Sequence, residues 1–66
     1  MNEYIVKFTD GEEIRIEGVS AKIVAMEAQL ERLETVNVSE IAHVEHIDTG
    51  KRYFEDGSIN VKKTYK

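Results

Sequence analysis

The chain has 66 residues, with no cysteine and no proline; 41% of the residues are hydrophobic and 33% are charged, and the formal net charge is −4. This length predicts one domain over residues 1–66, near the lower limit at which a core folds without disulfides or metals. The composition excludes a disulfide framework and is too apolar for a disordered chain. The charge is uneven: residues 1–50 carry four basic and eleven acidic side chains, or −7, and residues 51–66 carry five and two, or +3.

The N-terminal sequence MNEYIVKF contains no basic stretch and no long apolar run, so it is not expected to be a signal peptide. No segment approaches the roughly 18 apolar residues that a membrane span needs. Together with the lack of cysteine, these features favour a cytoplasmic protein that binds no membrane.

The first predicted element is a β-hairpin. KFTDGEEIRI places Asp-Gly between alternating runs, which is a strong hairpin signal because glycine adopts a positive φ without steric cost. A three-residue loop over residues 9–11 pairs Val6 with Ile14 and Tyr4 with Ile16, and so gathers the apolar side chains on one face, whereas a two-residue loop mixes the faces. We therefore predict strands at about 3–9 and 12–17.

The next segment, SAKIVAMEAQLERLET, predicts a helix over about 20–35 with Ser20 as its N-cap. Ile23, Met26, Leu30 and Leu33 recur at steps of three, four and three and form one stripe. We predict that this stripe packs on the chain's own sheet. The same spacing fits the seam of a coiled coil, but it spans barely two heptads.

Two further Gly-containing turns predict a three-strand meander. A three-residue loop at 48–50 sets Val44 opposite Phe54, and a two-residue loop at 56–57 sets Phe54 opposite Ile59. The predicted strands span about 41–47, 51–55 and 58–64. The alternative for 39–46 is a short helix capped by Ser39, and the strand is favoured. The predicted fold class is α+β: an antiparallel β-sheet with one helix packed across one face, in the order ββαβββ.

No catalytic residue and no metal site is predicted. The chain has no cysteine nucleophile, its serines stand in cap or turn contexts, and no glycine-rich loop leads into a helix. His43 and His46 belong to the only cluster with ligand chemistry, but on a strand they point to opposite faces and do not hold one ion. We expect a protein that is not an enzyme and uses no cofactor.

The C-terminal segment KRYFEDGSINVKKTYK interleaves basic and aromatic residues. Such a surface is typical of sheets that stack single-stranded bases and neutralise phosphates. However, the chain is acidic overall, and a Lys-rich last strand also protects an exposed sheet edge from pairing. Nucleic-acid binding is therefore the alternative function, and it would use Lys51, Arg52, Tyr53, Lys62, Lys63 and Tyr65.

In its size and its lack of cysteine the whole chain resembles the small accessory proteins of bacterial phages and prophages, many of which bind a host protein. The resemblance implies a protein-binding or regulatory role and assigns no residue to it. Three isoleucines are not used by the predicted core, and exposed apolar residues in a cluster usually mark a partner. The leading hypothesis is a non-enzymatic protein-binding module that self-associates, as a homo-dimer, through an exposed sheet face or edge carrying Ile5, Ile41, Ile47 and Tyr53.

Overall fold

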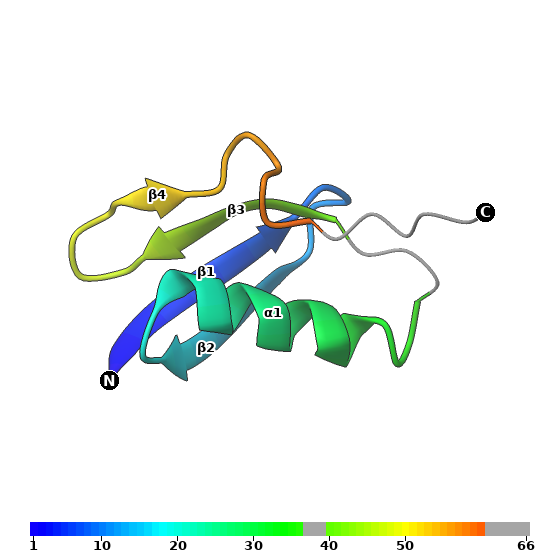
Figure 1. The fold of residues 1–66 in the computed structure, drawn as a ribbon, viewed down its shortest axis with the longest axis horizontal. Coiled ribbons are helices and arrows are strands. Elements are labelled where there is room, and N and C mark those ends of the chain that lie inside the picture. The colour runs from blue at the N-terminus through cyan, green and yellow to red at the C-terminus, as the bar shows by residue number, and fades with distance from the viewer. Residues whose placement is uncertain (37–39, 61–66) are drawn as a thin grey trace.

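The computed structural model describes residues 1–36 and 40–60, and within them one helix lies across one face of a single sheet (Figure 1). The elements follow in the order β1 (Asn2–Phe8), β2 (Glu13–Gly18), α1 (Ala21–Arg32), β3 (Ile41–His46) and β4 (Arg52–Tyr53). Neighbouring strands are antiparallel, and the sheet order is β2-β1-β3-β4. The predicted α+β class, with one helix on an antiparallel sheet, is confirmed.

The first hairpin has the predicted register, with Val6 opposite Ile14 and Tyr4 opposite Ile16. The N–H of Phe8 donates to the carbonyl of Glu12 at 2.8 Å, so residues 9–11 form the loop. Gly11 has a φ of 96°, in the left-handed region that an L side chain avoids. The three-residue loop therefore places the apolar side chains of β1 on the face under α1.

The helix begins after Ser20, whose Oγ accepts a hydrogen bond from the N–H of Ile23 at 3.3 Å. It is shorter than predicted at its C-terminal end, where turns follow Arg32.

The predicted buried face of α1 is wrong. The side turned to the sheet carries mostly small residues, Ala21, Val24, Ala25, Ala28 and Gln29, whereas the predicted stripe is exposed.

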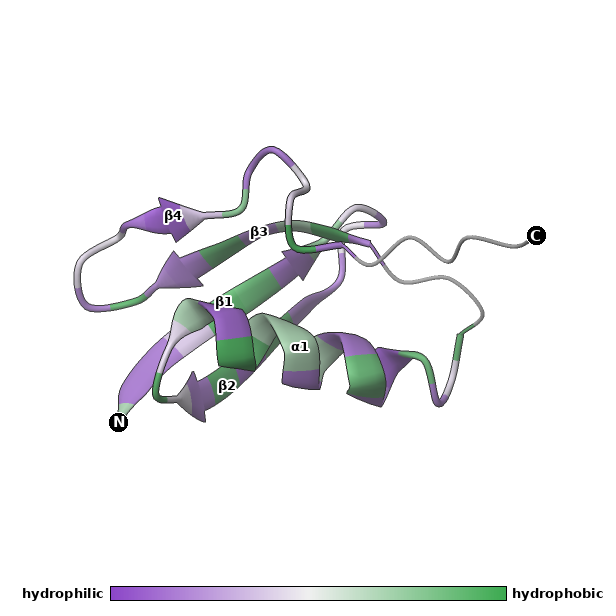
Figure 2. Cartoon of the chain, in the orientation of Figure 1, coloured by the Kyte–Doolittle hydropathy of each residue, from purple (hydrophilic) through white to green (hydrophobic). Residues whose placement is uncertain are grey.

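Close approach of helix and sheet explains this orientation. Gly18 ends β2, and a Cβ atom there would lie only 2.5 Å from Cγ2 of Val24. A glycine on the strand and alanines on the helix therefore let the two elements meet over a thin layer, while larger side chains of α1 point outward. Figure 2 shows hydrophobic residues also on the side of α1 that faces the viewer.

An irregularity in the pairing of β1 and β3 moves Ile41 into the core. Val6 pairs with Val44 and Lys7 with His43, but Phe8 pairs with Ile41, which leaves Ala42 as the extra residue. Ile41 is consequently 1% exposed, and its predicted place on the open face is wrong. The preference for a strand over a short helix in this segment is confirmed.

The turn between the paired residues His46 and Lys51 contains four residues instead of the predicted three. The N–H of His46 donates to the carbonyl of Lys51 at 2.8 Å, and Val44 pairs with Tyr53 instead of Phe54. Because a shift of one residue reverses the faces of a strand, Tyr53 lies on the same side as Val44, under α1. The predicted place of Tyr53 on the open face is therefore wrong.

The fifth strand, predicted at 58–64, is absent from its described part. Phe54 has a φ of 60°, which turns the chain out of β4 after two strand residues. Two turns follow, with Gly57 N–H donating to Phe54 O and Asn60 N–H donating to Gly57 O, both at 3.1 Å. Residues 58–60 thus lie in turns, and residues 61–64 fall outside the described residues.

The side chain of Asn60 binds the edge of β3 at Ile41. Its Oδ1 accepts from Ile41 N–H at 2.7 Å, and its Nδ2 donates to Ile41 O at 3.0 Å. Nε2 of Gln29 in α1 also donates to Oδ1, at 2.7 Å. One amide therefore imitates a neighbouring strand and connects β3 to the helix.

Candidate interaction surface

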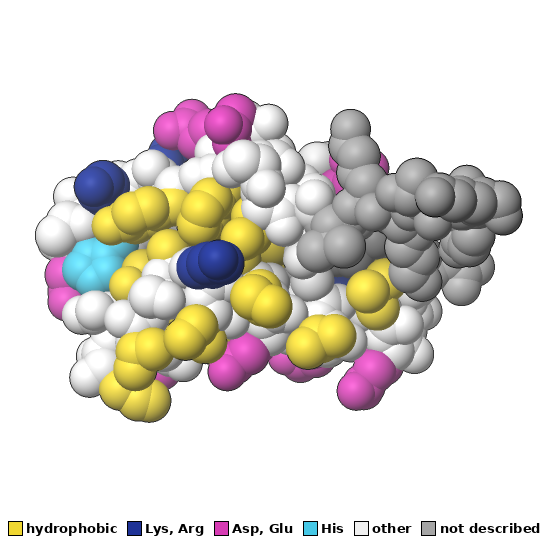
Figure 3. All heavy atoms as spheres, viewed as in Figure 1, with side chains coloured by type: hydrophobic (Ala, Val, Ile, Leu, Met, Phe, Trp, Pro, Cys, Tyr) yellow, Lys and Arg dark blue, Asp and Glu magenta, His cyan; other side chains and the backbone are white. Residues whose placement is uncertain are grey.

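A row of large apolar side chains runs along the outer side of α1, from just before its first residue to just after its last. We call it the outer stripe; it consists of Val19, Ile23, Met26, Leu30 and Leu33. Their exposed fractions are 65%, 43%, 48%, 67% and 44%. Figure 3 shows hydrophobic side chains gathered in a row along this face of the molecule.

The outer stripe follows from a helix that is apolar on two sides. Residues advance by about 100° per position, so the buried residues Ala21, Ala25 and Ala28 and the exposed residues Ile23 and Leu30 fall on opposite sides. The sheet covers only the side with small residues, which leaves the larger side chains in water.

Charged residues border the outer stripe differently on its two sides. Lys22 lies along one side, and Glu27 and Glu34 lie along the other, by the same helical spacing. All three are exposed. The stripe therefore has one basic border and one acidic border.

The structure does not bring the predicted sheet-face residues together. Ile5 is half-buried on the open face, paired with Arg15 on one side and Glu45 on the other. That face carries ion pairs, between Arg15 and Glu3 and between Arg52 and Glu45 at 3.5 Å. It is therefore a charged surface.

Two of the other three predicted contact residues lie on the helix side of the sheet. Ile41 is in the core, and Tyr53 is half-buried against the core on the helix side. Ile47 is half-buried in the turn after β3, where its N–H donates to the carbonyl of Glu3 at 3.1 Å. This bond continues the β1–β3 register by one residue, so by alternation Ile47 follows Glu45 and Ile5 on the open side.

The candidate nucleic-acid residues are divided between the two faces of the sheet. Lys51 places its Nζ 5.0 Å from the centroid of the Tyr53 ring. Arg52 lies on the opposite face from Tyr53 and pairs with Glu45. Lys62, Lys63 and Tyr65 lie outside the described residues. The described part thus joins Lys51 to Tyr53 and separates Arg52 from both.

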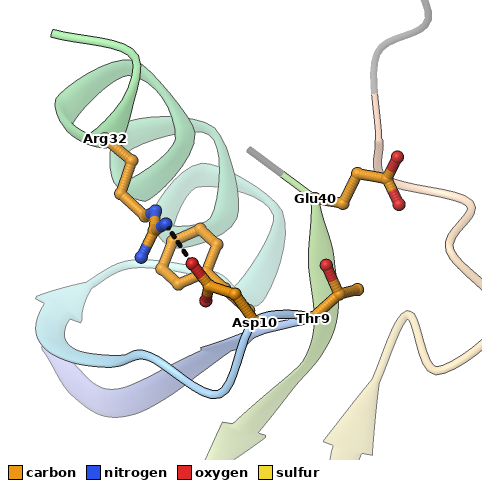
Figure 4. Close-up of a pocket in the computed structure, with 5 residues that line it drawn as sticks. Thr9, Asp10, Arg32 and Glu40 are labelled. Atoms are coloured by element: carbon orange, nitrogen blue, oxygen red, sulfur yellow. Dashed lines mark hydrogen bonds and ion pairs between the residues drawn. The ribbon is translucent and has the colours of Figure 1, made fainter. Parts of the chain in front are cut away.

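A small pocket of about 280 Å³ lies between the first hairpin and the C-terminal end of α1, lined by Phe8, Thr9, Asp10, Arg32 and Glu40 (Figure 4). The Arg32 guanidinium carbon stands 4.3 Å from the centroid of the Phe8 ring, and its Nη2 donates to Asp10 Oδ2 at 2.6 Å.

Asp10 is held in its charged form. The backbone N–H of Glu12, and next the guanidinium of Arg32, lower the pKa of the Asp10 carboxyl below its usual value. The arginine is thus paired with Asp10 and stacked on Phe8, and these contacts fasten the first hairpin to the end of α1.

The two histidines have structural neighbours. The ring of His46 meets Tyr4 edge-on, with centroids 5.1 Å apart, and its Nδ1 lies 2.9 Å from Thr49 Oγ1. His43 pairs with Lys7 in the sheet. Within residues 1–36 and 40–60, no group of three or more acidic or histidine side chains is arranged to hold a metal ion.

The outer stripe was not predicted as a surface, because Ile23, Met26, Leu30 and Leu33 were expected to pack on the sheet. The signal that could have identified it is the second apolar row, Ala21, Val24, Ala25 and Ala28, which repeats with the same helical period and competes for the sheet.

In the part of the chain that the structure describes, no helix is long and apolar enough to cross a membrane. No family model, curated protein or solved structure matches this chain.

Proposed function

We propose that this protein is a small, non-enzymatic protein-binding module that acts through the outer stripe of α1. The observation that carries the proposal is the orientation of the helix: alanines face the sheet, while Ile23, Met26 and Leu30 face water. Contiguous exposed apolar side chains with polar borders are typical of protein contact sites.

The architecture supports a contact made by the helix instead of the sheet. The open face of the sheet carries ion pairs around Ile5, and charged residues are depleted from the centres of protein interfaces. The helix lies on the sheet with its outer side turned to water, and an exposed apolar row along a helix is the pattern of helix-mediated recognition.

The proposal is tested with a dye that fluoresces on apolar surfaces, such as ANS, added to the folded, dilute chain. The variant Leu30→Gln removes the most exposed side chain of the stripe and keeps a good helix former. Ile5→Thr is the matched control on the open sheet face. We expect Leu30→Gln to lower the dye fluorescence clearly and Ile5→Thr to leave it unchanged.

The opposite ranking, with the dye responding to Ile5→Thr and not to Leu30→Gln, would contradict the assignment of the surface. A salt-sensitive titration with a mixed single-stranded oligonucleotide tests the alternative function in the same samples. Oligonucleotide binding that is lost on Lys51→Glu, with no effect of Leu30→Gln on the dye, would favour the nucleic-acid alternative.

A further inference from the structure

The spacing of the outer stripe fits the seam between two helices. Ile23, Met26, Leu30 and Leu33 are three, four and three residues apart, which matches the alternating a and d positions of a heptad. Side chains in this spacing interdigitate with the same pattern on another helix. The stripe can therefore be covered by a helix like itself.

The charged borders are complementary to each other. When two parallel helices pack along such a seam, a residue at a g position faces the residue five positions later on the other helix. Lys22 occupies a g position, and Glu27 is five residues later. In a parallel pair, Lys22 of each chain therefore faces the partner's Glu27, on both sides of the seam.

The antiparallel arrangement lacks this complementarity, because each border then meets the same border of the other copy. Glu27 would stand beside the partner's Glu27, and like charges in close contact weaken association. The pattern of charges therefore favours a parallel pair of α1 helices over an antiparallel pair.

Resting on the proposed function, we infer that the outer stripe binds a second copy of this chain, with the two α1 helices parallel and related by a two-fold axis. The two sheets then lie on the outside and the helices in the middle. Such an interface is isologous, with the same surface contributed by both chains.

The size of the surface sets the strength of the contact. A 12-residue helix is roughly 18 Å long. Such a helix offers less than the roughly 800 Å² per chain of a standard interface. We therefore expect dissociation in the micromolar range, with monomer and dimer exchanging as the concentration changes.

The first test is sedimentation equilibrium of the full chain from about 1 to 200 µM. We expect the average mass to rise from monomer toward dimer, Leu30→Gln to weaken the dimer at least tenfold, and Ile5→Thr to leave it unchanged. Dye fluorescence per chain should fall over the same range as the stripe becomes covered. A dimer that is insensitive to Leu30→Gln would overturn the inference.

The second test reads the orientation. Lys22→Glu alone and Glu27→Lys alone should each weaken the dimer about three- to tenfold, and the double variant should recover it, because each exchange restores an opposite-charge pair. Lys22→Glu places an acidic residue in the first turn of the helix, which favours helix formation. A weaker dimer in this variant is therefore not explained by loss of α1.

The chain has no cysteine, so a single introduced thiol gives a clean second reading of the orientation. In a parallel pair, Leu33→Cys meets its own copy and forms a disulfide under oxidation; in an antiparallel pair the two thiols are about 20 Å apart. A dimer without this disulfide and without charge recovery overturns the parallel arrangement. A chain that stays monomeric to 200 µM, but still loses dye binding on Leu30→Gln, overturns self-association and leaves the proposed function with a different protein partner.

Discussion

The side chain of Asn60 should contribute a large share of the stability of this domain. Asn60→Ala removes three hydrogen bonds and leaves the N–H and carbonyl of Ile41 and the amide of Gln29 without these partners, in a partly buried place. Each such loss costs about 0.5–1.5 kcal/mol, so the variant should lose about 2–4 kcal/mol. A core of this size rarely supplies more than roughly 3–5 kcal/mol of net stability.

The loss is measured by thermal unfolding followed by circular dichroism. For a domain of this length, each kcal/mol shifts Tm by roughly 4–8 °C, so Asn60→Ala should lower Tm by at least about 8 °C. Asn60→Asp keeps the acceptor oxygen, but its second carboxylate oxygen takes the place of the donor and faces the carbonyl oxygen of Ile41, so its Tm should also fall clearly below that of the unsubstituted chain. Ser58→Ala, in the same turn but exposed, is the control. A Tm for Asn60→Ala within about 3 °C of the unsubstituted chain would refute the reasoning.

Three further predictions concern single positions. Gly18→Ala forces a Cβ atom against Val24 and should destabilise the fold by about 1–3 kcal/mol. The loss should appear as a lower midpoint of urea unfolding. An unchanged midpoint would mean that α1 and β2 can move apart without a loss of stability. Phe54 has a positive φ, in the left-handed region. The Phe54→Gly variant should therefore be about 1 kcal/mol more stable than the Phe54→Ala variant in the same urea assay. The reverse order would show that this φ is not required. The pKa of Asp10 is lowered in the folded chain, so the stability it contributes is present above the unfolded pKa of about 3.8 and is lost as the pH falls through the lower folded value. Asp10→Asn should therefore make stability depend less on pH below 4, and an identical acid profile would contradict the role of its contacts with the Glu12 N–H and Arg32.

Local signals were sufficient to predict the first half of the fold. The Asp-Gly corner, the alternation of apolar residues and the cap at Ser20 act over a few residues, and they gave the correct register for β1 and β2 and the correct start of α1. The strand at 41–46 was also correctly preferred over a helix.

The orientation of the helix could not be predicted in the same way, because two apolar rows with the same period compete for one sheet. The choice depends on contacts between residues far apart in sequence, such as the hydrogen bond between Gln29 and Asn60. The prediction for the C-terminal strands was wrong for a related reason. One extra residue at Ala42 and one in the turn after His46 each reverse the faces of a strand. The alternation of apolar residues in the sequence does not indicate either extra residue.

The candidate surface was therefore found by structure, although its residues had been identified as an apolar row. Ile23, Met26, Leu30 and Leu33 were correctly grouped on one side of a helix. Sequence periodicity shows which side chains share a side, but it does not show which side meets the sheet.

A helix that touches its sheet through alanines also affects how the folded chain responds to temperature. The heat capacity change of unfolding grows with the apolar surface that becomes exposed to water. In this chain the largest apolar side chains of α1 are already exposed in the folded state. Calorimetry on the dilute chain should therefore give less than the roughly 12–15 cal/mol/K per residue of ordinary domains, with a broad and shallow stability curve.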